Sequence, residues 1–237
     1  MAKRGAHIIA LASDTAADGR VATLVDLLRT TTANERIFAE ECDVTQPSSV
    51  RSFCTKFVTG NETRIDAVVF AHEYAHIGNL LGKSNTREDE NGQREAGAMA
   101  TFLMITLLLP ALLVAPVERD IRIIQVVNPF YAAGVPTFTA SPTPEGTSTF
   151  VAEGKRALRS AILGAHLQRV LDALPNRSQP PAAAAGEQTI PVVSAGAQRS
   201  NIVSVSVSPG FSRSDTIRRL LNADLGEPGF SRVGFLL

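Results

Sequence analysis

The sequence has no tryptophan, and aromatic residues make up only 5% of it. A protein that holds single-stranded nucleic acid by stacking bases on aromatic side chains would need more of them. Lysine plus arginine equal aspartate plus glutamate at 23 each, so the net charge is zero and no basic field attracts a phosphate backbone. These absences argue against nucleic acid as a partner.

Cysteine is scarce as well, with only Cys42 and Cys54 present, too few for a disulfide framework. Cys42 ends a predicted strand and Cys54 lies in a predicted helix, which indicates two buried thiols in a reducing, cytoplasmic setting. The longest apolar run, residues 102–116, contains Pro110 and falls short of the roughly 20 residues that cross a bilayer. We therefore expect no transmembrane segment, while peripheral contact with a membrane stays open.

The sequence also lacks the beginning of a pattern that its later part follows. Residues 5–13 predict a buried parallel strand that leads into a helix, and only Met1–Arg4 precede them. In a nucleotide-binding fold, a first strand and a glycine-rich phosphate loop would come before such a strand. We expect a fragment of a longer protein, and the abrupt apolar end after Asp224 favours the same interpretation. The alternative is a sheet that has closed up by pairing the strands on either side of the missing one.

What is present is a regular alternation of strands and helices. Runs rich in Ile and Val predict strands at 7–13, 36–42, 65–70, 121–128 and 201–207. Helical patterns lie between them at 18–32, 48–58, 93–114 and 148–174. The order predicts an α/β protein with a Rossmann-like, doubly wound parallel sheet that is incomplete, in a single domain over 1–237. The charged stretch 83–91 is predicted to be a loop, and 177–200 a low-complexity surface insertion.

Several modest motifs succeed one another in a fixed order along the chain. They are RIFAEECDVTQPSSVRSF, RIDAVVFAHEY, FLMITLLLPALL, RIIQVVN, GKRALRSAILGAHL and NIVSVSVSPGFSRSDT. This succession resembles the short-chain dehydrogenase/reductase family over about nine-tenths of the chain. The resemblance implies an NAD(P)-binding domain, with NAD or NADP as cofactor and a small carbonyl or alcohol as substrate. It also implies a possible homodimer formed through the helices at 93–114 and 148–174.

Cofactor contacts can be carried over position by position from this resemblance. The residues concerned are Ser13, Asp14, Asp43, Val44, Ala71, Lys155, Pro209, Gly210 and Ser212. Asp43 and Val44 would flank the adenine, and the backbone of Ser212 would face the nicotinamide carboxamide. An Asp at position 14 would favour NAD, because a carboxylate accepts a hydrogen bond from a free 2′-hydroxyl and repels a phosphate. Asp43 has a second interpretation, since Asp is also a good residue for the start of a helix.

The departures from the family pattern concern its catalytic groups. The catalytic Tyr falls at Val151 and the catalytic Ser at Asn128, while the partner Lys155 is retained. Val151 has no proton to give to a developing alkoxide, whereas Asn128 can still polarise a carbonyl. Tyr131, in the loop after the strand at 121–128, is a candidate substitute donor. The catalytic candidates are thus Lys155, Asn128 and Tyr131, and the alternative is a non-catalytic scaffold that keeps the fold.

A different chemistry is indicated by His72-Glu73-Tyr74-Ala75-His76, which matches the zinc motif H-E-x-x-H. Its context differs from that of a zinc enzyme, because it directly follows a strand and Gly78 comes soon after it. A third ligand would have to be Glu88, Glu90 or Glu95. We therefore predict no metal site and keep a zinc hydrolase as a remote alternative.

Overall fold

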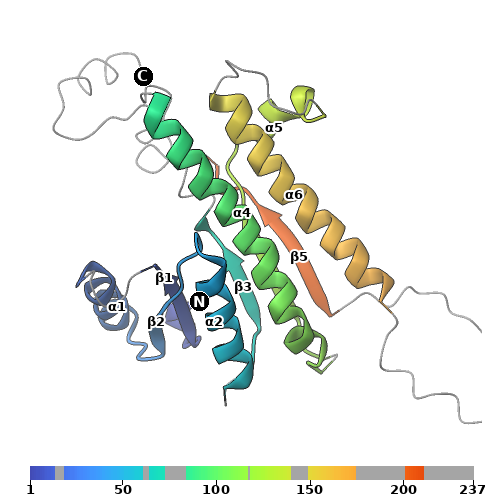
Figure 1. Cartoon of the computed structure of the whole chain (residues 1–237). Helices are drawn as coiled ribbons and strands as arrows, with labels where there is room; N and C mark the ends of the chain where they lie inside the picture. Colours follow the sequence, from blue (N-terminus) through green and yellow to red (C-terminus); the bar gives the residue numbers. More distant parts are fainter. Residues whose placement is uncertain are drawn as a thin grey trace, which may run out of the picture. The chain divides into compact units, whose positions relative to one another are not determined.

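The structure is a computed structural model that describes residues 1–13, 19–60, 64–72, 84–116, 118–139, 149–174 and 201–210. At positions 84–91, 93, 94 and 149 it describes the backbone alone. The chain divides into two compact units, residues 1–63 with 91–113, and residues 64–90 with 114–237. Figure 1 labels the helices and strands of both. Each unit contains a parallel sheet of its own.

The first unit contains a parallel pair of strands, β1 (Ile8–Ala12) and β2 (Ile37–Glu41), paired along their whole length. Helix α1 (Gly19–Thr32) makes the crossover that a parallel connection needs. The 3-10 turn η1 (Ala2–Arg4) precedes β1. In the described part of the chain, β1 pairs with β2 alone.

The end of α1 is fixed by a left-handed residue and a buried amide. Ala33 has a φ of 51°, and the Asn34 N–H donates to the Arg29 carbonyl at 3.2 Å, the long bond that closes a helix end of this kind. The Asn34 side chain is buried and donates to the carbonyls of Ala2 and Ala6 at 3.0 and 2.9 Å. The turn between α1 and β2 thereby holds the start of the chain in place.

Helix α2 (Pro47–Thr59) begins with proline at its first position, where a missing N–H leaves no bond unmade. Its buried residues, Val50 and Cys54, are four positions apart and so lie on one face. Cys54 and Cys42 are both free and buried, which confirms the prediction of two buried thiols.

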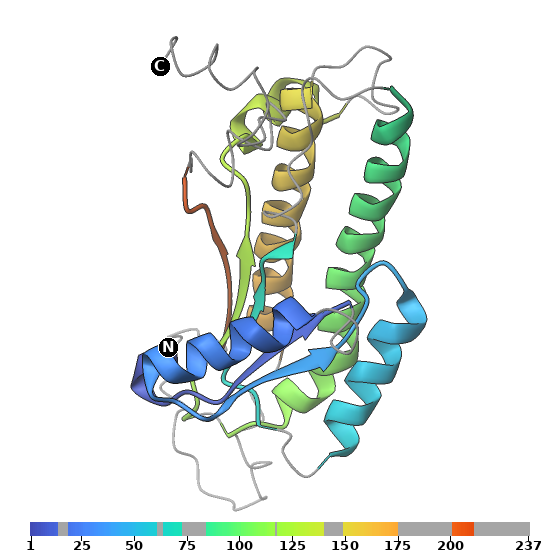
Figure 2. The ribbon, with the colours of Figure 1, turned by 90° about the vertical axis from the view of Figure 1, so that its left-hand side faces the viewer.

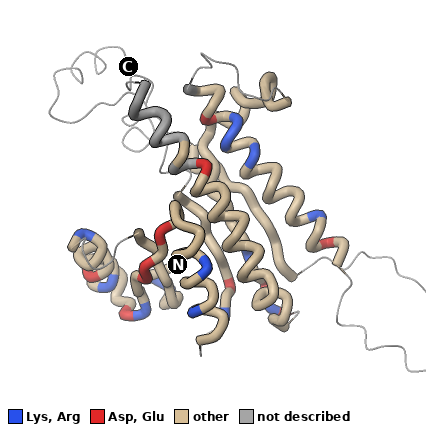
Figure 3. The backbone as a smooth tube through the Cα atoms, in the orientation of Figure 1, with Lys and Arg blue, Asp and Glu red and all other residues tan. Residues whose placement is uncertain are grey.

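Helix α4 (Ser84–Leu113) contributes its part from Asn91 onward to the first unit. Its buried side chains recur every three or four positions, namely Ala100, Thr101, Met104, Ile105, Leu108 and Leu112. The segment Glu95–Leu113 is long and apolar enough to cross a membrane, with a mean hydropathy of 2.1. Figure 3 shows that most of this helix carries no charged residue. The same test is passed by core helices, and the regular buried stripe is the pattern of a helix that packs against protein on one side.

The second unit is built on three parallel strands in the order β3 (Ala67–Phe70), β4 (Ile121–Val126) and β5 (Ile202–Val207). Helix α6 (Thr149–Ala173) follows β4 and runs along β4 and β5 in both ribbon views (Figure 1 and Figure 2). The helix comes close to the sheet at Gly164, where an added Cβ would lie 3.0 Å from the Ser206 Oγ, a side-chain atom that can shift. Helix α6 therefore covers one face of this sheet.

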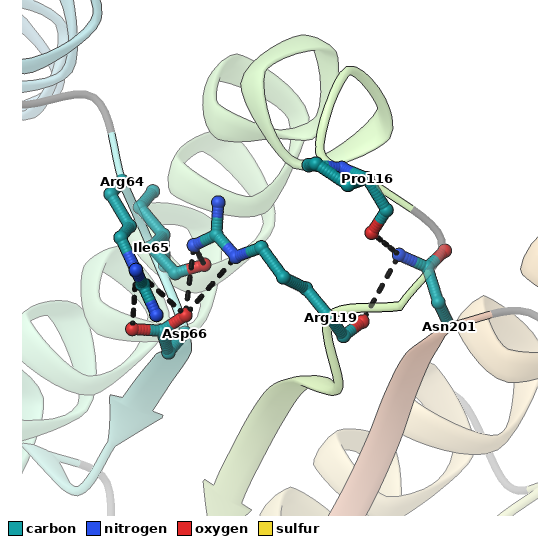
Figure 4. A network of polar contacts seen from close by, with 6 residues as sticks. All are labelled: Arg64, Ile65, Asp66, Pro116, Arg119 and Asn201. Carbon is teal, nitrogen blue, oxygen red and sulfur yellow. Dashed lines mark hydrogen bonds and ion pairs between the residues drawn. The ribbon is translucent and has the colours of Figure 1, made fainter.

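A polar network ties the amino ends of the three strands together (Figure 4). The Arg119 guanidinium donates to the Asp66 carboxylate at 2.8 Å and to the Ile65 carbonyl at 3.0 Å. The Asn201 amide donates to the carbonyls of Pro116 and Arg119, each at 3.2 Å. Side chains before β3, β4 and β5 thus fix the strands at the edge where each begins.

The predicted fold class is confirmed: the protein is α/β, with small parallel sheets and helical crossovers. The loop predicted at 83–91 is wrong, because α4 already begins at Ser84. Arg and Glu are good helix formers, so a charged stretch without apolar period also suits a helix. Direct pairing of the strands beside the missing one is not found among the described residues, where β1 pairs with β2 and β3 with β4. The insertion predicted at 177–200 lies outside the described residues.

Candidate functional site

The carboxyl ends of the three strands in the second unit gather several of the predicted site residues. Phe70 lies opposite Gln125, and Val126 opposite Val207, so the three strands end at one edge. Just beyond that edge the chain continues into residues 71–72, 127–128 and 208–210. Ala71, Asn128, Pro209 and Gly210 therefore share the rim where open α/β sheets bind ligands.

Asn128 is buried, and its carboxamide is already committed to the local backbone. Its Oδ1 accepts a hydrogen bond from the Phe130 N–H at 3.0 Å. This bond leads the chain from β4 into the short helix α5 (Tyr131–Gly134), followed by the 3-10 turn η2 (Val135–Thr137). The acceptor oxygen of Asn128 thus helps to turn the chain after β4, and the other end of the carboxamide, its NH2, is a hydrogen-bond donor.

Lys155 lies on the second turn of α6, directly beside α5. Its side chain is only 4% exposed, and its backbone nitrogen would lie 2.5 Å from a Cβ added at Gly134. Val151 is half-buried one turn earlier on the same helix. Tyr131 is 45% exposed on α5. Within one unit the structure therefore brings together the element that carries Tyr131 and the element that carries Lys155.

Glu153 is a buried charged residue near Lys155 that the sequence analysis did not single out. It is 1% exposed and pairs with the Arg156 guanidinium at 3.2 Å, three residues along α6. A buried carboxylate beside a buried lysine places three charges in two turns of helix, which is costly unless each is compensated. The signal was available: helical spacing puts Glu153 on the same face as Ala157 and Gly164, which both pack inward.

In the first unit, Ser13, Asp43 and Val44 lie where β1 and β2 end. The Cys42 N–H donates to the Ala12 carbonyl at 2.8 Å, which places the two chain segments side by side. Asp43 Oδ1 accepts from the Thr45 N–H at 2.8 Å and from the Thr45 hydroxyl at 2.6 Å. The carboxylate forms a turn ahead of α2 rather than capping it, since Gln46 is the cap residue.

Two electrostatic consequences follow for this part of the first unit. Burial, and then the Asp43 carboxylate, raise the pKa of the Cys42 thiol. Burial, with Cys42 adding to the effect, raises the pKa of the Cys54 thiol to about 11. Both thiols are therefore protonated and inert near neutral pH, and neither is a candidate nucleophile.

Other predicted residues are placed only in part. Asp14 and Ser212 lie outside the described residues, as do Glu73 and His76 of the zinc motif. His72 is half-buried, with its ring 6.2 Å from that of Phe70. Within the described ranges no group of three His, Cys, Asp or Glu residues could hold a metal ion.

The chain is similar to two curated oxidoreductases of yeasts, although no family model matches it. An uncharacterised oxidoreductase of Saccharomyces cerevisiae is 30% identical over 130 residues, which are 52% of this chain and 31% of that protein. An uncharacterised oxidoreductase of Schizosaccharomyces pombe is 25% identical over 135 residues, 56% of this chain and 35% of that protein. The matched segments thus span about a third of the length of these curated relatives.

Among solved structures, a metagenomic short-chain oxidoreductase in complex with NADP is similar to the chain. The TM-score is 0.53 at 16% identity, and the match covers 99% of this chain and 81% of that one. At this identity the likeness concerns the fold. The resemblance read from the order of the sequence motifs is confirmed at that level.

Proposed function

The chain is a relative of the short-chain dehydrogenases/reductases, and from that kinship we propose that it is the core of an NAD(P)-dependent oxidoreductase. The substrate is a small carbonyl compound or alcohol. One observation carries the proposal: Asn128, Pro209 and Gly210 share the carboxyl edge of a three-stranded parallel sheet, and α6 brings Lys155 to the loop that follows β4. Two free, buried cysteines suit a cytoplasmic location.

The residues of the second unit suit the nicotinamide end of the cofactor. The Lys155 side chain, which is buried, would hold the ribose hydroxyls, and Gly210, with a φ of 84°, makes a turn after β5. When bound, the nicotinamide ring supplies or accepts the hydride. The Asn128 amide donates a hydrogen bond to the substrate oxygen, and Tyr131 supplies the proton that Val151 lacks.

The residues of the first unit suit the adenosine end. Ser13 and Asp43 lie at neighbouring strand ends, and Val44 offers an apolar contact for a ring. The short-chain oxidoreductase of known structure holds NADP. An acidic Asp14 favours NAD here, because a carboxylate repels the 2′-phosphate. NAD is therefore the cofactor we propose, with NADP as the competitor.

The test is binding of NADH and NADPH to the purified chain, followed by nucleotide fluorescence and by thermal shift. We expect saturable binding with NADH tighter than NADPH, and hydride transfer to a panel of small ketones and aldehydes. Lys155→Met should weaken binding, Tyr131→Phe should lower kcat with little change in KM, and Lys56→Met serves as the matched control on an exposed lysine. A folded chain that binds neither nucleotide contradicts the proposal.

A second candidate function is a non-catalytic scaffold of the same fold. The observation in its favour is Val151, which stands half-buried where the family has its proton donor. This hypothesis predicts nucleotide binding without turnover, or no binding. In either case Tyr131→Phe should change neither the binding nor the turnover. Restoring the donor with Val151→Tyr discriminates the two, since turnover that appears only in this variant identifies a scaffold derived from an enzyme.

A further inference from the structure

Helices α5 and α6 meet through two glycines whose backbones are in direct contact. A Cβ added at Gly154 would lie 2.4 Å from the Phe130 carbonyl oxygen and 2.5 Å from the Gly134 nitrogen. A Cβ added at Gly134 would lie 2.4 Å from the Gly154 carbonyl carbon and 2.5 Å from the Lys155 nitrogen. All the atoms that these added carbons would meet belong to the backbone, so the clash cannot be relieved by the movement of a side chain. Glycine is the only residue that permits this spacing at either position.

The contact is one of the ties that hold α5 against α6, and so short a helix depends on such ties. A helix of four residues has no stability of its own. Besides the glycine contact it has the edge-to-face packing of Phe130 on Phe150, with ring centroids 5.1 Å apart, and the bond from the Phe130 N–H to Asn128 Oδ1. These ties run from the end of β4 through α5 to the first two turns of α6.

We propose that Gly134 and Gly154 are positioning residues, whose backbone contact sets the place of Tyr131 and Asn128 relative to Lys155 and keeps the Lys155 side chain covered. Lys155 is 4% exposed, and its backbone nitrogen takes part in the contact. The functional meaning of the contact rests on the proposed oxidoreductase function. The burial of the Lys155 side chain does not depend on that function, and it can be measured whether or not the chain turns over a substrate.

The first test is the rate of lysine acetylation by a water-soluble N-hydroxysuccinimide acetate, read peptide by peptide by mass spectrometry. The chain has four lysines, Lys3, Lys56, Lys83 and Lys155. The side chain of Lys56 is 70% exposed and serves as the internal reference. In the unaltered chain Lys155 should react at about a tenth of the Lys56 rate or below, because it reacts only when α5 opens. Equal rates would overturn the proposal at once.

Gly154→Ala and Gly134→Ala should raise the Lys155-to-Lys56 ratio to about ten times its original value, because the added carbon separates α5 from α6. Gly164→Ala is the matched control on the same helix, where the added carbon meets side chains at 3.0 Å or more, and its ratio should not change. If Gly154→Ala melts cooperatively and leaves the ratio unchanged, the proposal is wrong.

Should both glycine variants fail to fold, Phe150→Ala tests whether the aromatic packing beside the glycines, rather than the glycine contact, keeps Lys155 covered. It removes the ring that packs on Phe130 from a residue already 36% exposed. The Lys155-to-Lys56 ratio should stay near its original value in this variant, because the glycine contact is intact, and a tenfold rise would overturn the proposal.

A kinetic readout separates positioning from simple support of the fold. In an active chain, Gly154→Ala should lower kcat by about 100-fold, because a displacement of the order of 1 Å is enough, and leave KM for the nucleotide within about threefold. A loss confined to thermal stability, with kcat unchanged in the folded fraction, would show a merely structural contact. Failure of the chain to bind any nucleotide would remove the proposed function and leave the acetylation result standing.

Discussion

Gln125 is a buried residue whose side-chain amide has no hydrogen-bond partner at either end within the described structure. It lies under α6, where Gly164 packs against it, and Ser204 Oγ beside it is unpaired as well. An unpaired buried amide costs about 1–3 kcal/mol. We expect Gln125→Met, of similar volume, to raise the free energy of unfolding by that amount in urea titrations.

Gln168 is the control for this change, because both ends of its amide are hydrogen-bonded. Its oxygen accepts from the Ser204 N–H at 2.7 Å and its nitrogen donates to Asp172 at 2.8 Å. Gln168→Met should therefore lower the free energy of unfolding by about 1 kcal/mol. If both variants destabilise the chain equally, the Gln125 amide has a partner that the structure does not show.

Asp66 gives the second unit a dependence on acid. Its hydrogen bond from Arg64, and then that from Arg119, hold the pKa of this carboxyl below its usual value. The folded pKa is depressed, so the stabilisation is complete above the unfolded pKa of about 3.9 and is lost as pH falls through the folded pKa. In Asp66→Asn, the free energy of unfolding should fall less steeply below a pH of about 4 than in the unaltered chain. Unfolding followed by circular dichroism at several pH values measures this. An identical acid profile for both proteins would contradict the network.

The two cysteines offer a test of burial in the first unit. Because burial raises the pKa of both thiols, iodoacetamide at about pH 8 should leave them unmodified in the native chain and alkylate both in urea. Stability should also fall as pH rises from the ordinary thiol pKa toward the value near 11 of Cys54, since only the unfolded chain then ionises freely. Rapid native alkylation of Cys54 alone would mean that α2 opens.

At the scale of elements, the residue just after α1, Ala33, adopts a backbone conformation that is unfavourable for alanine. Ala33 occupies a left-handed position that glycine takes without strain. Ala33→Gly should stabilise the chain by about 0.5–1 kcal/mol, the relief of strain less the entropy that glycine loses. Ala22→Gly, inside the same helix, should cost about 1 kcal/mol, and thermal melts of the two variants should shift in opposite directions.

The elements also show where sequence reasoning succeeds and where it stops. The five strands were predicted within two residues of their ends, because runs of Ile and Val between helical patterns leave little choice. Helix α5 was missed, since four residues are too few to show a period. The Gly134–Gly154 contact was equally invisible, because it depends on two segments meeting in space. The individual roles of Asn128, Tyr131 and Lys155 remain predictions, taken from the order of motifs.

At the scale of the whole molecule, residues 96–113 of α4 carry no charged side chain, and Met99 is 66% and Phe102 55% exposed. We expect two copies to pair through this stretch of α4, because an isologous contact lets the same apolar residues cover one another. Sedimentation should give a mass of twice 25.2 kDa, and Phe102→Glu should halve it. Leu24→Glu, on the exposed side of α1, should leave the dimer intact. A monomer at all concentrations would contradict this expectation.

The bonds from Asn201 to Pro116 and Arg119 join positions 85 and 82 residues apart, and the strand that follows Asn201 pairs with β4 across a similar interval. On the ribosome, β4 is therefore synthesised long before β5, the strand that pairs with its second edge. Pairings of such long range form late and slowly, and until then one edge of β4 stays open to other chains. The second unit is thus the part of this protein that we expect to depend on a chaperone during synthesis, to keep the open edge of β4 from aggregating.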